Sequence, residues 1–89
     1  MTRSKTLPAL LFAVVLPGGA FALPQVGDVV GTNPEVVRPA LEAAGCKVDE
    51  FQVEDGLVEA KCHEVASGKR WEIYIDPQTG VVRKLSVDD

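Results

Sequence analysis

The sequence predicts an α+β fold in which one N-terminal helix packs on a four-stranded antiparallel meander sheet. Three observations lead to this prediction. Apolar residues first recur at helical spacing and then alternate with polar residues along the rest of the chain. Short turn signatures separate the alternating runs, and short turns make consecutive strands pair antiparallel. A sheet with one apolar face needs a cover, and the helix is the only cover that the sequence offers.

The N-terminal segment has the organisation of a secretory signal peptide. Arg3 and Lys5 form a positive start, an apolar run of about ten residues follows, and Ala20-Phe21-Ala22 fits the small-x-small cleavage pattern. The apolar run is roughly half as long as a bilayer core requires, so we expect no stable membrane anchor after cleavage. We divide the chain into a signal peptide (1–22), an irregular lead-in (23–33) and a folded domain (34–89).

The charge balance argues against two classes of partner. Cleavage after Ala22 removes Arg3 and Lys5 and keeps all 13 acidic residues, which takes the net charge from −4 to −6. Binding to nucleic acid needs clustered lysine and arginine side chains, and anionic membrane surfaces attract basic segments. The composition therefore argues against a nucleic-acid partner and against binding to an anionic membrane surface.

A helix is predicted between Thr32-Asn33-Pro34-Glu35 and Gly45. The first motif supplies a capping side chain and a proline at a position where its missing N–H costs nothing, and glycine is a good C-terminal stop. Pro39 removes the hydrogen bond to the carbonyl of Glu35, so we expect an irregular first turn. One apolar stripe runs along this helix: Val36, Val37, Ala40, Leu41 and Ala44.

The remaining residues predict four strands: Cys46 to Val53, Leu57 to Val65, Arg70 to Ile75 and Val81 to Val87. Glycine-containing turns separate them, namely Glu54-Asp55-Gly56, Ser67-Gly68-Lys69 and Asp76-Pro77-Gln78-Thr79-Gly80. Alternation places Trp71, Ile73 and Ile75 on the face that meets the helix. The opposite face carries charges and is expected to meet water. In a meander the two free edges are Lys47 to Val53 and Val81 to Val87.

Cys46 and Cys62 are the two cysteines, and an exported protein meets an oxidising compartment, so we predict a disulfide between them. The bond would close a loop of 15 intervening residues and contribute about 3 kcal/mol of stability. A two-residue Asp55-Gly56 loop pairs Cys46 with Val65, so a longer loop or a β-bulge must bring the cysteines together. A metal site that uses His63, or free thiols, are the alternatives.

The other polar residues give few candidate sites. His63 is the only histidine, and alternation points it to solvent, away from Cys62. Six carboxylates crowd the first hairpin without the spacing of a calcium loop, and we expect them to be solvated: Asp49, Glu50, Glu54, Asp55, Glu59 and Glu64. We therefore expect no catalytic residue, no metal ligand and no cofactor. Tyr74 on the open face and Arg83 and Lys84 on the last strand are the candidate interaction residues, although edge charges also discourage self-pairing.

The stretch from Trp71 to Leu85 resembles the end of a PepSY domain. Three motifs stand in the order typical of that family: Ala43-Ala44-Gly45, Glu54-Asp55-Gly56 and Asp76-Pro77-Gln78-Thr79-Gly80. The resemblance covers about residues 34–85, whereas the cysteine pair and Pro39 are not general features of the family. It implies a one-helix, four-strand unit found in bacterial exported proteins and in propeptides of thermolysin-type metalloproteases. No catalytic residue follows from it.

These observations together predict a periplasmic or secreted binding module. It would hold or inhibit a protein partner, such as a peptidase, in trans through a sheet edge or the open face. The alternative is a small metal- or ligand-binding envelope protein that uses the acidic face and His63. An enzyme is a third class, but one helix on one sheet leaves little room for a catalytic cleft.

Overall fold

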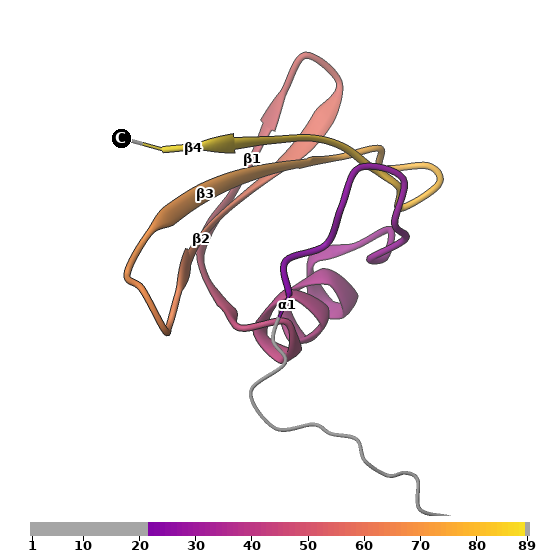
Figure 1. Ribbon diagram of the computed structural model, residues 1–89. Helices are drawn as coiled ribbons and strands as arrows, with labels where there is room; N and C mark the ends of the chain where they lie inside the picture. Colours follow the sequence, from indigo (N-terminus) through magenta and orange to yellow (C-terminus); the bar gives the residue numbers. More distant parts are fainter. Residues whose placement is uncertain (1–21, 89) are drawn as a thin grey trace, which may run out of the picture.

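The computed structural model describes residues 22–88, in which one helix is followed by four strands (Figure 1). The elements are α1 (Pro34–Ala43), β1 (Cys46–Glu54), β2 (Leu57–Glu64), β3 (Arg70–Ile75) and β4 (Val82–Val87). The fold is therefore α+β. The helix is not at the N-terminus, because it begins only after the lead-in. The predicted signal peptide, apart from Ala22, lies outside the described residues.

The helix begins and ends where the sequence predicts. Asn33 is the N-cap, and its side-chain Oδ1 accepts a hydrogen bond from the backbone N–H of Val36 at 3.1 Å. Gly45 follows with a φ of 91°, a left-handed conformation that glycine adopts at little cost. Pro39 lies inside the ten-residue helix. The predicted apolar stripe is wrong at one end, since Val36 is 50% exposed.

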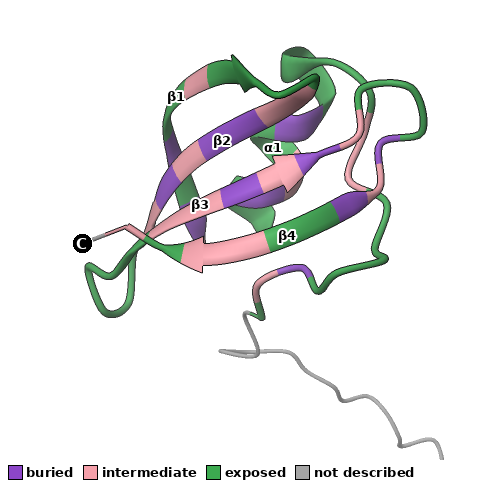
Figure 2. Ribbon diagram, turned by 90° about the horizontal axis from the view of Figure 1, so that it is seen from above, coloured by how far each residue is buried: buried purple, intermediate pink, exposed green. Residues whose placement is uncertain are grey.

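The four strands form one antiparallel sheet in the order β1-β2-β3-β4, as the meander predicts (Figure 2). Asp55 and Gly56, with φ angles of 55° and 78°, form the two-residue loop between β1 and β2. The turn between β3 and β4 is fixed by Asp76, whose Oδ1 accepts hydrogen bonds from the backbone N–H groups of Gln78 and Thr79. Each connection is short, which forces consecutive strands to be neighbours.

A β-bulge in β1 decides the register of the first hairpin. Glu54 pairs with Leu57 at the turn, but the register shifts between Val48 and Glu50, so Cys46 lies opposite Glu64 rather than Val65. Side chains alternate between the two faces of a strand, so a shift of one residue turns Cys46 to the other face. The bulge thereby places both cysteines on the helix side of the sheet.

The core lies between α1 and the facing side of the sheet. Nine residues are buried there: Val37, Leu41, Cys46, Val48, Ala60, Cys62, Ile73, Ile75 and Val82. Trp71, which was predicted to face the helix, packs against this cluster but is only half-buried. The helix packs on β1, and the tip of the β1–β2 hairpin extends away from it (Figure 1). Val53, which lies beside that tip on the edge strand, is correspondingly exposed.

The lead-in adds contacts that the sequence does not predict. Val29 forms an antiparallel bridge with Val81, and Val82 exchanges backbone hydrogen bonds of 2.8 Å with Gly27 and Asp28. The lead-in is therefore paired with the beginning of β4. The prediction that the whole segment from Val81 to Val87 is a free edge is wrong at its first two residues.

Candidate functional site: the open face and the sheet edges

The face of the sheet away from α1, which we call the open face, is largely polar. Cross-strand partners share a face, so the register assigns the residues on it. They are Lys47, Glu50, Gln52 and Glu54 on β1, Leu57, Glu59, Lys61 and His63 on β2, Arg70, Glu72 and Tyr74 on β3, and Lys84 and Ser86 on β4. The open face therefore carries most of the titratable groups of the sheet.

The candidate interaction residues lie at the β3–β4 side of the molecule. The hydroxyl of Tyr74 donates a hydrogen bond to Glu72 Oε1 at 3.1 Å, and Lys84 Nζ lies 5.1 Å from the centroid of the Tyr74 ring. Desolvation and the nearby carboxylates raise the pKa of Tyr74 to about 12. Arg83 Nη1 contacts Asp76 Oδ2 at 3.2 Å. Tyr74 and Lys84 thus form one cluster, whereas the Arg83 side chain contacts the turn between β3 and β4.

Glu59 is the buried acid of the open face, and the sequence does not predict its burial. It lies on the inner strand β2 between Gln52 and Tyr74, and its exposed fraction is 2%. Burial raises the pKa of Glu59, and a hydrogen bond to Glu54 and the charge of Glu72 raise it further, whereas Lys61 opposes them. The expectation that all six hairpin carboxylates are solvated is therefore wrong for Glu59.

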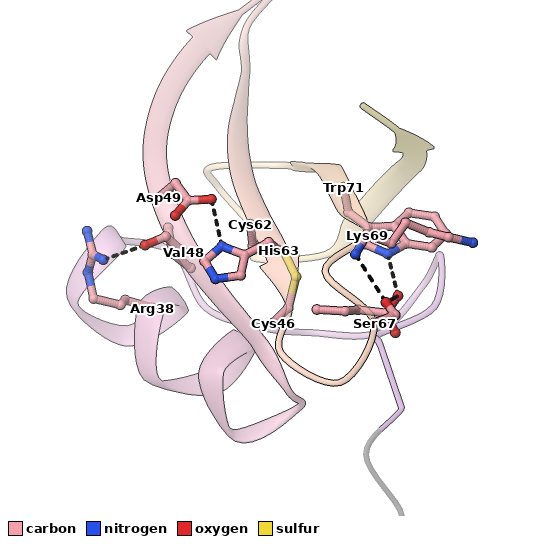
Figure 3. Close-up of a disulfide and its surroundings, with 10 residues drawn as sticks. Arg38, Cys46, Val48, Asp49, Cys62, His63, Ser67, Lys69 and Trp71 are labelled. Carbon is pink, nitrogen blue, oxygen red and sulfur yellow. Dashed lines mark hydrogen bonds and ion pairs between the residues drawn. A yellow bond between two sulfur atoms is a disulfide. The ribbon is translucent and has the colours of Figure 1, made fainter. Parts of the chain in front are cut away.

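Glu64 is a second acid whose position differs from that expectation. It is half-buried, and its Oε1 accepts hydrogen bonds from Trp71 Nε1 at 3.0 Å and from Ser67 Oγ at 3.2 Å. Lys69 Nζ lies 5.6 Å from the Trp71 ring (Figure 3). The carboxylate of Glu64 thus satisfies a half-buried indole N–H, which is a structural role.

His63 pairs with the bulge residue of β1. Its Nδ1 lies 3.0 Å from Asp49 Oδ2, and both side chains are partly exposed on the sheet surface (Figure 3). Such a pair orients an imidazole, but nucleophilic catalysis also needs a hydroxyl or thiol within reach of the ring. Among the hydrogen bonds of residues 22–88, the His63 side chain contacts only Asp49. The arrangement is that of a polar surface contact.

The Cys46–Cys62 disulfide is present. Its Cα atoms are 5.5 Å apart, and the two cysteines are 0% and 1% exposed, respectively (Figure 3). Such burial removes the sulfur atoms from solvent and therefore from reductants. We conclude that the bond links β1 to β2 structurally, as a β-bulge was expected to allow.

Sites of other kinds would need clustered metal ligands, a membrane-spanning helix or an enclosed cavity. No group of three or more His, Cys, Asp or Glu side chains in residues 22–88 could hold a metal ion. No helix in the described part of the chain is long and apolar enough to cross a membrane. A small apolar cleft at the start of α1, bounded by Pro34, Val58 and Pro77, has room for about one water molecule. The open face and the sheet edges are the candidate surfaces that the four-stranded meander presents.

The two sheet edges differ in what covers them. On β4, the lead-in pairs with Val82 and leaves the edge free further along the strand. On β1, Arg38 Nη1 donates a hydrogen bond to the backbone carbonyl of Val48 at 3.2 Å (Figure 3). Beyond the bulge, from Glu50 to Glu54, no element of the described chain pairs with the outer side of β1.

Comparison with known proteins gives one match. The model of the family described as "Peptidase propeptide and YPEB domain" matches residues 6–85, which is most of the chain. The match begins within the segment predicted as a signal peptide and ends on β4. No curated protein and no solved structure matches.

Proposed function

The chain belongs to the family of peptidase propeptide and YPEB domains, that is, to the PepSY domains, and from this we propose that it is a non-catalytic binding module that restrains a peptidase in trans. The observation that carries the proposal is the open sheet, whose edges β1 and β4 both retain stretches without a backbone partner within residues 22–88. An extended polypeptide can add to such an edge as a further strand. Domains of this family are propeptide- or inhibitor-type modules.

We also propose that the protein is exported. The first 22 residues have the features of a signal peptide, and the buried disulfide suits an oxidising compartment. We propose that the mature protein begins near Leu23 and acts in the periplasm or outside the cell. Its acidic charge would favour encounter with a basic partner surface, because long-range attraction accelerates association.

Inhibition can be measured directly. The purified chain, with its disulfide formed, is added to a bacterial thermolysin-type metalloprotease, and hydrolysis of a small chromogenic peptide is followed. We expect saturable inhibition while mass spectrometry shows the chain intact, because a binding module is not consumed. The control is the same chain after reduction and unfolding, which should be degraded without inhibiting.

A second experiment tests whether the chain binds a peptidase in its own cell envelope. The chain should therefore be cross-linked in an envelope extract of a bacterium that encodes it, and captured proteins identified by mass spectrometry. If the folded chain inhibits no metalloprotease and captures no peptidase, the proposed function is wrong.

A further inference from the structure

We propose that the outer edge of β1 from Glu50 to Glu54 binds an extended segment of a partner protein in which apolar and basic side chains alternate. This inference rests on the proposed function, since it names the chemistry of the partner for one of the two sheet edges. Three features of the edge carry it: free backbone groups, a partly exposed apolar side and an acidic opposite side.

The backbone groups follow from the hairpin geometry. A two-residue loop is closed by a hydrogen-bonded pair, here Glu54 and Leu57, and bonded pairs alternate with non-bonded pairs in an antiparallel ladder. Phe51 opposite Ala60 and Val53 opposite Val58 are therefore non-bonded pairs. The N–H and C=O groups of Phe51 and Val53 point away from β2. In the described chain, no hydrogen bond outside the ladder involves them.

The hydrogen bonds at the other end of β1 agree with this alternation. The backbone N–H of Val65 donates to the carbonyl of Gly45 at 2.9 Å, which makes the pair of Val48 and Cys62 non-bonded. The carbonyl of Val48 should then point outward, and Arg38 does bind it from outside. Arg38 thus occupies the outward carbonyl of Val48, whereas no such bond is made to β1 beyond the bulge within residues 22–88.

The helix-facing side of this free edge is apolar and poorly covered. Phe51 is half-buried, with the guanidinium of Arg38 5.3 Å from its ring centroid, and Val53 is 79% exposed. The tip of the β1–β2 hairpin projects beyond the helix (Figure 1), and Val53 stands one residue before the end of β1, close to that tip. An added strand would place every second side chain beside these two residues, and apolar side chains there would remove apolar surface from water.

The other side of the edge is strongly acidic. Glu50 and Glu54 lie there on either side of Gln52, with Glu59 behind them on β2. Of the charged residues of the first hairpin, Glu50, Glu54 and Glu59 lie on this face together with Lys47 and Lys61, and beyond the bulge β1 itself carries no cation. Cationic side chains in the alternate positions of an added strand would face Glu50 and Glu54. Their charge would offset a repulsion that Lys61, opposite Glu50, offsets only in part.

The β4 edge is basic, whereas the β1 edge is acidic. Its free part carries Arg83 and Lys84, and the lead-in occupies the backbone groups of Val82. By the same alternation, Leu85 and Val87 are the residues whose backbone groups point outward there, because Asp88 donates a hydrogen bond to Arg70. A basic segment should therefore prefer β1, and the β4 edge of the same molecule is an internal control.

The test is a titration of the full chain, labelled with nitrogen-15, with capped seven-residue peptides. One peptide alternates lysine and valine, and a second alternates glutamate and valine. We expect the lysine peptide to shift the amide signals of Phe51 and Val53 and to slow their hydrogen exchange. The glutamate peptide should bind at least tenfold more weakly. Raising the salt concentration should weaken the binding of the lysine peptide only.

Matched variants distinguish binding through the backbone groups of the edge from binding through its side chains. Val53→Pro removes an outward N–H without removing a ladder bond, so the sheet should remain folded while binding falls at least tenfold. Val53→Ala keeps the N–H, and Val87→Pro makes the proline change on the other edge. Each of these variants should bind the lysine peptide more tightly than Val53→Pro does. If Val53→Pro does not fold, the exchange rates of Phe51 and Val53 in the unmodified chain still decide the question.

The outcomes are distinct from those for the proposed function. Shifts at Leu85 and Val87 instead, equal binding of the two peptides, or no binding would each overturn the assignment to β1 while leaving peptidase inhibition untouched. Growth of higher oligomers with concentration, with protection at Phe51 and Val53, would show that the edge pairs with a second copy and would equally overturn it.

Discussion

Gly80 lies directly against the backbone of Gly31: a Cβ built on Gly80 would stand 2.8 Å from the carbonyl carbon and the carbonyl oxygen of Gly31. The contact joins the turn before β4 to the lead-in, next to the 2.8 Å hydrogen bond from Val30 N–H to the carbonyl of Gly80. Since the obstacle is backbone rather than a flexible side chain, it cannot easily move aside.

Gly80→Ala should therefore be strongly destabilising. Gly80 has a φ of 75°, so alanine meets both a strained conformation and a steric clash, and we expect a loss of about 3 kcal/mol or more. Gly68→Ala is the matched control, because Gly68 has a φ of 78° and open space around its Cβ position. It should lose only about 1 kcal/mol. Urea unfolding measures both, and equal losses would show that the Gly31 contact is unimportant.

Deletion of Asp49 should prevent the disulfide. Without the bulge, the Asp55-Gly56 loop pairs Cys46 with Val65 and turns it away from Cys62. We expect free thiols in the deletion variant, measured with a thiol reagent under denaturing conditions. Asp49→Ala keeps the residue count and should form the disulfide normally. A fully oxidised deletion variant would mean that the turn, rather than the bulge, can adjust the register.

The Cys46→Ala/Cys62→Ala variant should unfold more easily by about 3 kcal/mol, because the unfolded chain regains the freedom of the loop. For a domain of this size, each kcal/mol corresponds to roughly 4–8 °C in Tm, so a loss of more than 10 °C is expected. Thermal unfolding followed by circular dichroism provides the measurement. The unmodified protein with a reductant added should approach the variant, and an unchanged Tm in the variant would contradict the role given to the bond.

Glu59→Gln should change how stability depends on pH. Burial raises the pKa of Glu59 above its ordinary value of 4.5, so the folded state binds a proton that the unfolded state has released. The contribution of Glu59 to the free energy of unfolding is therefore greatest below pH 4.5 and is lost as pH rises through the folded-state pKa. The variant should be more stable than the unmodified chain at pH 7, with a smaller difference at pH 4.

Glu54→Gln is the companion variant to Glu59→Gln. Glu54 raises the pKa of Glu59 through a hydrogen bond and through its charge, so its removal should shift the same titration to lower pH. Denaturant midpoints between pH 4 and pH 8 would show the effect. Identical pH profiles for the unmodified chain and both variants would mean that Glu59 is solvated in solution.

The sequence by itself determined the local elements. The capping motif at Asn33, the stop at Gly45, the alternation from Arg70 to Ile75 and the glycine-containing turns each depend on the conformational preferences of a few neighbouring residues. Short connections then fix antiparallel neighbours, so the strand order also follows from the sequence. Even the need for a bulge or a longer loop followed from counting residues between Cys46 and Cys62.

Only the tertiary structure decided which surfaces are buried or free. The bulge could lie anywhere along the hairpin, and its position at Asp49 depends on the packing of β1 against α1 and β2. The burial of Glu59 depends on Gln52 and Tyr74, which alternation places beside it only once the register is known. The lead-in reaches β4 through backbone hydrogen bonds, which no side-chain pattern records. These features depend on contacts between residues distant in the sequence, and such contacts leave no local signature.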